Sequence, residues 1–210
     1  MSLSLLDWRR RTQALYADVR RTADPRAAHQ LWRHGRDELL ATHPDSPLLA
    51  MDRIEFTGLP VAPYDPRLRF EVDADLDVEP CRIEVPTGSD GIVPFQRVAV
   101  LRLAGVGSLD VWWLASYGGG VFVPVKDALA GRETYGGGRY LLDTVKGADL
   151  GGDIDPDTGA GTFVVDLNLA HNRPAPDPAW ACPLAPPGNR VPAEIRAGEL
   201  TVPLTVPRLR

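Results

Sequence analysis

From residue 46 onward, the chain consists of short runs of alternating apolar and polar residues, separated by glycine, proline and aspartate. This period of two with frequent turn residues is typical of β-strands. In the clearest case, the turn at residues 105–108 joins residues 97–103 to residues 109–114 in a predicted hairpin. We expect strands at residues 53–57, 68–75, 80–86, 93–104, 109–115, 121–126, 139–144, 162–168 and 191–197. Because no helical segment separates these runs, the pattern favours an antiparallel β-barrel or sandwich over a parallel α/β sheet.

The N-terminal part of the chain has a helical pattern instead. Residues 3–22 place apolar side chains near helical spacing, with arginines on the remaining face. Asp24 and Pro25 supply an N-cap and a first-turn proline for a second helix, which should end near His43 and Pro44. The sequence therefore predicts an N-terminal helical pair.

Length and composition indicate one folded unit. The chain has 210 residues, of which 44% are hydrophobic and 24% charged, as is usual for a globular domain. We expect a single domain over residues 1–210, mainly β in an α+β arrangement, with a helical unit of residues 1–44 packed on a β-rich body of residues 45–210.

Several classes of function do not fit the composition. The net charge of −5 argues against a nucleic-acid-binding protein. The N-terminus lacks the apolar region of a signal peptide, and no apolar run is long enough to cross a membrane. Cys81 and Cys182 lie far apart with no CxxC spacing, so neither a zinc site nor a disulfide framework is indicated. We expect a cytoplasmic protein with no membrane partner, no bound metal and no cofactor.

The densest motif is residues 131–140, Gly-Arg-Glu-Thr-Tyr-Gly-Gly-Gly-Arg-Tyr. Its three glycines resemble those of residues 118–120, where the plain interpretation is a turn with positive φ. In the charged copy, the glycines would let backbone N–H groups approach a ligand. We take the ligand-binding candidates of this motif to be Arg132 and Arg139 as donors to a carboxylate or phosphate, Tyr135 and Tyr140 as walls, and Glu133.

A second polar segment covers residues 166–172, Asp-Leu-Asn-Leu-Ala-His-Asn. If a strand runs to residue 168, Asp166 and Asn168 share one face, and His171 and Asn172 lie just past its end. Asp166 could then orient the imidazole of His171 as a general base, which makes these two residues the catalytic candidates. The alternative is a polar cluster that satisfies a buried turn. Cys182 as a nucleophile paired with His171 is a weaker hypothesis.

Over nearly its whole length, the chain resembles DUF1684, a family of proteins of unknown function. The resemblance rests on residues 46–48, 56–59, 131–140, 182–184, 189–190 and 195–199, and the ten-residue motif is its most specific part. The segment that begins at Asp166 is similar to a family pattern D-F-N-x-A-Y-N-P followed by a cysteine. This chain departs from that pattern with His171 for tyrosine, Arg173 for proline and Ala175 for cysteine. The resemblance implies a shared fold and site, but no reaction.

Three hypotheses of function follow. The favoured one is a soluble protein or enzyme with a pocket for a small anionic metabolite at one end of a β-barrel, and it predicts that the candidate residues converge on a cavity. The alternative is an interaction module that docks a partner or a second subunit, as in a homodimer, through the helices that carry Trp8 and Trp32. It predicts that Arg132, Glu133 and Arg139 are buried and mutually paired. A flavin or haem split barrel is compatible with the β-rich pattern, but no motif supports it.

Overall fold

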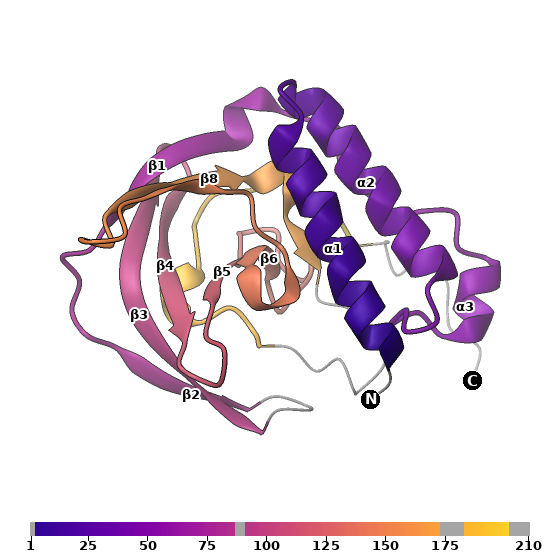
Figure 1. Ribbon diagram of the computed structural model, residues 1–210. Helices are drawn as coiled ribbons and strands as arrows, with labels where there is room; N and C mark the ends of the chain where they lie inside the picture. The colour runs from indigo at the N-terminus through magenta and orange to yellow at the C-terminus, as the bar shows by residue number, and fades with distance from the viewer. Residues whose placement is uncertain (1–2, 87–90, 173–182, 202–210) are drawn as a thin grey trace.

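Two long helices lie side by side across the open side of a curled antiparallel sheet (Figure 1). The computed structural model describes residues 3–86, 91–172 and 183–201. Helix α1 spans Leu3–Arg21, helix α2 spans Pro25–Thr42, and a short helix α3 spans Ala50–Ile54. None of the helices in these ranges is both long and apolar enough to span a bilayer.

The helical pair forms where the sequence predicts it. The Asp24 carboxylate caps α2 by accepting a hydrogen bond from the backbone N–H of Arg26 at 3.1 Å, and Pro25 is the first residue of the helix. The helix ends at Thr42, as expected from the break at His43. Between the two helices, the indole N–H of Trp32 donates to the hydroxyl of Tyr16 at 3.1 Å, and both side chains are buried.

The sheet has the strand order β7-β8-β1-β3-β4-β5-β6-β9, with β2 paired to β3, and every pairing is antiparallel. The strands are β1 (Arg69–Asp75), β2 (Arg82–Pro86), β3 (Ile92–Leu103), β4 (Gly107–Leu114), β5 (Val121–Val125), β6 (Arg139–Asp143), β7 (Gly152–Ile154), β8 (Gly161–Asp166) and β9 (His171–Asn172). The predicted hairpin is β3–β4, in which Leu103 pairs with Gly107. The mainly β fold with an N-terminal helical pair is confirmed, and its sheet is an antiparallel half-barrel.

Two predicted strands are wrong. Residues 53–57 do not form a strand, because the chain turns into α3 up to Ile54. Residues 191–197 contain no strand, because their backbone bonds to other groups: the carbonyl oxygens of Ile195 and Ala197 accept hydrogen bonds from the buried guanidinium of Arg139. The short strands β7 and β9 were not expected, since two or three residues carry no readable alternation.

One hydrophobic core joins the helices to the sheet. Tyr16 and Trp32 from the helices belong to the same buried cluster as Leu101, Leu109 and Leu141 from the strands. A second, aromatic cluster contains Phe95, Trp112, Phe122 and Tyr140. The middle of α1 and the C-terminal half of α2 border a cavity that β6 and β9 also line.

Candidate functional site

A cavity of about 860 Å³ lies between the helices, the segment 47–60 and the end of the sheet. One group of lining residues, from the helices and from segment 47–60, is apolar and consists of Trp8, Leu15, Leu39, Leu40, Pro47, Leu48, Phe56, Leu59 and Pro60. The facing group, from the sheet and from the residues after 130, is mostly polar and includes Thr134, Tyr135, Tyr140, Asp143, Lys146, His171, Asn172, Glu199 and Thr201.

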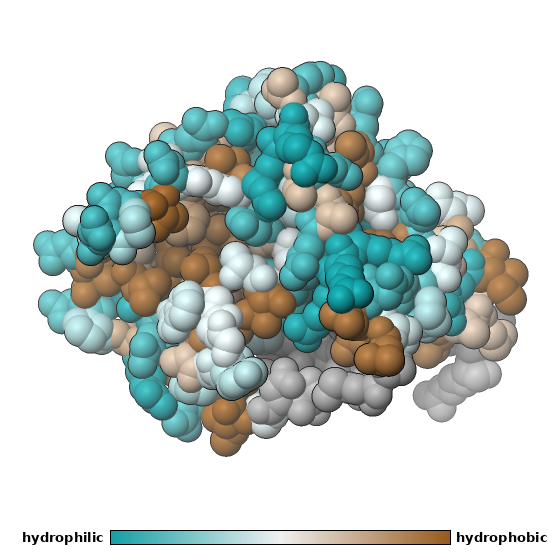
Figure 2. Space-filling model, in the orientation of Figure 1, coloured by the Kyte–Doolittle hydropathy of each residue, from teal (hydrophilic) through white to brown (hydrophobic). Residues whose placement is uncertain are grey.

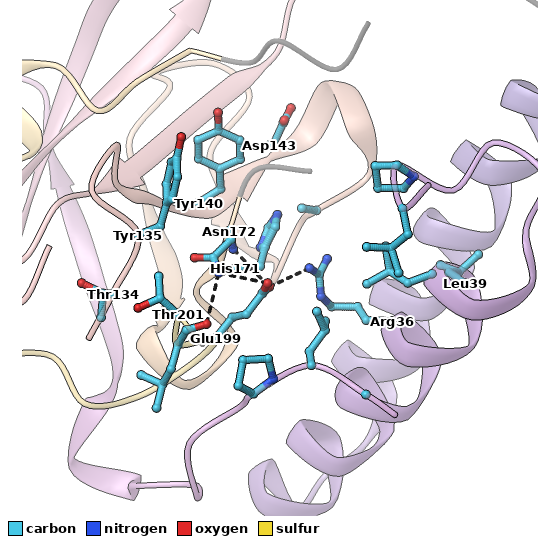
Figure 3. A pocket seen from close by; sticks show the side chains of 18 of the residues that line it. Arg36, Leu39, Thr134, Tyr135, Tyr140, Asp143, His171, Asn172, Glu199 and Thr201 are labelled. Atoms are coloured by element: carbon cyan, nitrogen blue, oxygen red, sulfur yellow. Dashed lines mark hydrogen bonds and ion pairs between the residues drawn. The ribbon is translucent and has the colours of Figure 1, made fainter. Parts of the chain in front are cut away.

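The two groups form opposite walls. In Figure 3, Arg36 and Leu39 project from α2 on one side, Thr134 and Tyr135 lie on the other, and His171, Asn172 and Glu199 lie between them. The volume of the cavity lies within the range of small-molecule sites, and one of its walls is apolar while the other is mostly polar.

A carboxylate with three donors forms the floor between the walls. Glu199 is 6% exposed. Its Oε2 accepts hydrogen bonds from Nη2 of Arg36 at 2.9 Å and from the backbone N–H of Asn172 at 3.1 Å, and its Oε1 accepts one from Nδ2 of Asn172 at 3.0 Å (Figure 3). Through these bonds Glu199 connects α2 to β9.

Arg139 holds the backbone that carries Glu199. Its guanidinium donates to the carbonyl oxygen of Glu199 at 3.2 Å, to that of Ile195 at 3.1 Å, and to that of Ala197. The same group donates to Oδ2 of Asp127 at 3.0 Å. Arg139 is fully buried, so this arrangement is a structural lock that positions the floor from behind.

Three polar atoms of the cavity residues have no hydrogen-bond partner in the described part of the chain. They are Nε of Arg36, Nδ1 of His171 and Oδ1 of Asn172, and all three are buried. Burial lowers the pKa of His171 well below its usual value of 6.5, and the charges of Arg36 and Lys146 act in the same direction. The imidazole is therefore neutral near pH 7.

The lining has a small excess of positive charge. Arg36, Arg132 and Lys146 are basic and Asp143 and Glu199 are acidic, so with neutral His171 the sum is three minus two, or +1. Arg36 is paired with Glu199 at 2.9 Å, and Nζ of Lys146 lies 3.3 Å from Oδ2 of Asp143. Nη2 of Arg132 lies 3.8 Å from a carboxylate oxygen of Glu194, and the Arg132 side chain is 67% exposed.

The structure brings five of the nine predicted residues together. Arg132, Tyr135, Tyr140, His171 and Asn172 line the cavity. Tyr140 packs edge-on against His171, with ring centroids 5.8 Å apart, and its hydroxyl donates to the carbonyl oxygen of Pro183.

The other two candidates from the ten-residue motif lie elsewhere. Arg139 is part of the buried lock, and Glu133 lies on the surface, where it accepts a hydrogen bond from Nε of Arg196 at 3.0 Å. Arg132 is also largely exposed. The three residues are thus not the buried, mutually paired set that the interaction-module hypothesis predicted.

Asp166 does not orient His171, and no hydrogen bond joins the two within the described ranges. The Asp166 carboxylate accepts from the backbone N–H of Asn168 at 2.9 Å and from its Nδ2 at 2.8 Å. Asn168 in turn bonds to the backbone N–H and carbonyl of Asp65, each at 2.8 Å. Asp166 borders a separate, smaller cavity of about 150 Å³. This is the buried-turn cluster of the alternative interpretation.

Asp166 and Asn168 do not share one face of a strand as expected, and the reason is local. Strand β8 ends at Asp166, and the 3-10 helix η3 (Leu167–Leu169) begins directly after it, so a period of two does not extend to Asn168. Burial raises the pKa of Asp166, while the bonds from Asn168 lower it.

The two runs of three glycines, residues 118–120 and 136–138, lie in different structural environments. Gly118, Gly119 and Gly120 have φ values of 91°, 59° and 156°, as expected for a turn. In the second copy, Gly138 has φ 93°, and a Cβ atom there would lie 2.7 Å from the Cβ of Ala185. Gly138 is therefore required by close packing within the protein, while Gly136 lines the cavity.

Sequence reasoning missed the pair that organises the floor. Arg36 is one of many arginines in this chain and stands out by no motif, so only its helical spacing from Trp32 and Leu39 could have suggested it. Glu199 ends the segment 195–199 that carries part of the family resemblance, and this was its only signal.

The hypothesis of a Cys182 nucleophile cannot be placed on the described residues. Cys182 lies outside the described residues, and Cys81 is a free thiol. Within the described ranges, no group of three or more histidine, cysteine, aspartate or glutamate residues is arranged to hold a metal ion.

Comparisons with known proteins identify relatives without an assigned activity. A family model described as a protein of unknown function, DUF1684, matches residues 54–200. The solution structure of an uncharacterised protein from Haloarcula marismortui is similar, with a TM-score of 0.55 and 27% identity over 82% of this chain and 91% of that one. No curated protein matches.

Proposed function

This chain belongs to DUF1684, a family of proteins of unknown function, and we propose that it binds a small anionic metabolite in the cavity between its helical pair and its sheet. The observation that carries this proposal is the convergence of Arg36, His171, Asn172 and Glu199 at the floor of a cavity of about 860 Å³ with one apolar wall.

The polar residues at the floor support a ligand that has both a polar and an apolar part. Arg36, His171, Asn172 and Glu199 all line the cavity. A ligand seated between the walls would meet these polar residues, and its apolar part would displace water from Leu39 and Phe56.

The charge of the lining supports an anion. The sum of +1 is balanced by one negative charge on the ligand. The neutral imidazole of His171 adds an uncharged polar residue to the lining. Binding is the function proposed.

The docking alternative has one observation in its favour. Met51 and Ile54 on α3 are 81% and 85% exposed, and Figure 2 shows apolar side chains at the edge where α3 lies. However, the aromatic residues that this alternative invoked face inward, since Trp32 is fully buried and Trp8 lines the cavity. We therefore favour the ligand-binding function.

A matched pair of leucine variants tests the proposal. Leu48 lines the cavity, whereas its neighbour Leu49 is 55% exposed and does not. We expect a thermal-shift screen of metabolites to give a hit on the wild type and on Leu49→Trp, and to give none on Leu48→Trp, in which an indole fills the cavity. A ligand at a hundred times its Kd stabilises the native state by about 2.7 kcal/mol.

The unliganded melting temperatures of the two variants serve as the folding control. If every hit persists on a well-folded Leu48→Trp, the ligand binds elsewhere and the proposal fails. If no anionic compound shifts the wild type at all, the docking alternative takes its place.

A further inference from the structure

The apolar wall of the cavity is not part of the hydrophobic core. Leu15, Leu39 and Leu40 are buried, and all three line the cavity. Figure 3 shows Leu39 on the side of the cavity opposite Thr134 and Tyr135. Neither of the two core clusters formed by the described residues contains any of these leucines. The core thus leaves them beside a space that its own side chains do not fill.

A second group of apolar wall residues is only partly buried. It comes from α1 and from the segment 47–60, and it consists of Trp8, Leu48, Phe56, Leu59 and Pro60. Within the described ranges, none of these residues packs into either core cluster. Apolar surface that stays in contact with water is unfavourable, and an apolar ligand would remove it from water. The wall therefore favours a ligand with a large apolar part.

The size and composition of the wall favour a flexible chain. The cavity volume of about 860 Å³ would hold roughly thirty water molecules at about 30 Å³ each, so an anion with only a few carbon atoms would leave most of the wall against water. Apart from Trp8 and Phe56, the apolar wall consists of leucine and proline, and it is drawn from two helices and from both ends of the segment 47–60. An alkyl chain can follow such a wall, whereas a single planar ring would cover only part of it.

The charges of the cavity match one anionic group. Two of its three cations are paired with carboxylates of the lining, Arg36 with Glu199 at 2.9 Å and Lys146 with Asp143 at 3.3 Å. The lining sum of +1 is balanced by a single negative charge. A second anionic group at the far end of the ligand would exceed this balance and would lie against the apolar wall, where an unpaired charge is costly.

We infer that the ligand is a fatty acid, that is, a monocarboxylic acid with a straight alkyl chain. The chain lies along the wall that contains Leu39, Leu48 and Phe56, and the carboxylate lies toward the opposite, polar wall. This inference rests on the proposed function and names the class of anion for the same site.

Isothermal titration calorimetry of hexanoate, octanoate and decanoate on the wild type tests the alkyl chain. Each step adds two CH₂ groups, and we expect each step to tighten binding by roughly tenfold, because two buried CH₂ groups contribute about this much affinity. Two other ten-carbon acids serve as controls: decanedioate has a carboxylate at both ends, and 4-phenylbutanoate has a ring in place of most of the chain. We expect both to bind more weakly than decanoate, by about tenfold or more.

An affinity that does not change with chain length, or that is equally high for either control, would overturn this inference. If the fatty acids do not bind but another anion from the metabolite screen does, and Leu48→Trp abolishes its binding, the proposed function stands without the inference. If no anion binds the wild type, both fail together.

Two pairs of variants locate the chain. Decanoate binding should be lost in Leu48→Trp and retained in Leu49→Trp. Phe56→Asp places a carboxylate on the wall, and we expect it to weaken decanoate binding by about tenfold or more. Its control is Ile54→Asp, at a residue that is 85% exposed and outside the lining, and it should leave binding unchanged. Undiminished binding in a folded Leu48→Trp or Phe56→Asp would place the chain elsewhere and overturn the inference. The Phe56 variant decides the location if Leu48→Trp does not fold.

Discussion

The guanidinium of Arg139 lies 3.0 Å from the carboxylate of Asp127, and the two side chains are 0% and 1% exposed. Burial lowers the pKa of Arg139, while the Asp127 charge opposes this shift. The carboxylate also accepts hydrogen bonds from the Thr134 hydroxyl at 2.9 Å and from the backbone N–H of Leu129 at 2.8 Å. The pair therefore fastens the loop at residues 127–134 to β6 and, through the carbonyls bound by Arg139, to the segment that carries Glu199.

We predict that Arg139→Met is strongly destabilising. Removing one partner leaves the Asp127 carboxylate buried without its counter-ion, which typically costs about 3–5 kcal/mol. Urea denaturation followed by circular dichroism measures the change in the free energy of unfolding. Arg132→Met is the matched control from the same motif: its side chain is 67% exposed, and a surface change of this kind stays within about 0.5 kcal/mol. A loss below about 1 kcal/mol for Arg139→Met would show that the buried pair does not hold the fold.

The ion pair at the cavity floor should show energetic coupling. Arg36 and Glu199 are 2.9 Å apart, with side chains 19% and 7% exposed. In a double-mutant cycle with Arg36→Gln and Glu199→Gln, we expect a coupling free energy of about 0.5–3 kcal/mol. The exposed pair of Arg67 and Asp65 provides the comparison, and we expect its coupling to be weaker than that of the floor pair. Additive effects of the two floor variants would mean that the pair does not connect α2 to the C-terminal segment.

His171 should make stability depend on pH. Burial lowers its pKa well below 6.5 in the folded protein, whereas in the unfolded chain it titrates near about 6.5. Below that pH the unfolded state binds more protons than the folded state does. The free energy of unfolding therefore falls as pH falls, by up to about 1.36 kcal/mol per pH unit. The contribution is fully present above the unfolded pKa and is lost on acidification.

The measurement is urea denaturation of the wild type and of His171→Gln at several pH values between 5 and 8. The pKa of buried His29 is also lowered, so the wild type alone cannot isolate one histidine. Subtracting the free energy of unfolding of His171→Gln from that of the wild type cancels the contributions that both proteins share, including that of His29. This difference should shrink as pH falls below about 6.5. If the free energy of unfolding changed with pH in the same way for both proteins, the assignment of a neutral, buried imidazole would be contradicted.

Most of the fold could be predicted because the signals are local. Asp24 and Pro25 mark the start of α2 by themselves, and the alternation within residues 97–103 is sufficient to predict the β3 strand of the hairpin. Residues 191–197 have the composition of a strand, but the carbonyl oxygens of Ile195 and Ala197 bind the side chain of Arg139 on β6 instead of a neighbouring strand. No pattern within a segment can reveal that its partner is a buried arginine.

The dense polar motifs of the sequence point to one cavity, but not to the ion pair at its floor. Tyr135, Tyr140, His171 and Asn172 all line that cavity. Arg36 and Glu199 are separated by 163 residues, and their contact depends on how α2 lies across the sheet. Arg139 looked like a ligand donor because its charge is visible in the sequence, whereas its complete burial is not.

The glycines of the ten-residue motif allow steric crowding to be separated from backbone strain. Gly131 and Gly138 have φ values of 86° and 93°, so an alanine at either position is strained by about 1–2 kcal/mol. A Cβ at Gly131 would meet nothing within 4 Å, whereas at Gly138 it would lie 2.7 Å from the Cβ of Ala185 and 3.0 Å from the carbonyl oxygen of Val125. We expect Gly138→Ala to destabilise the protein by about 1–3 kcal/mol more than Gly131→Ala in urea denaturation. Adding Ala185→Gly to Gly138→Ala should recover part of that difference, because it removes the nearer of the two contacts. Equal losses for the two alanine variants would mean that the conformation alone, and not the close approach of residue 185, requires glycine in this motif.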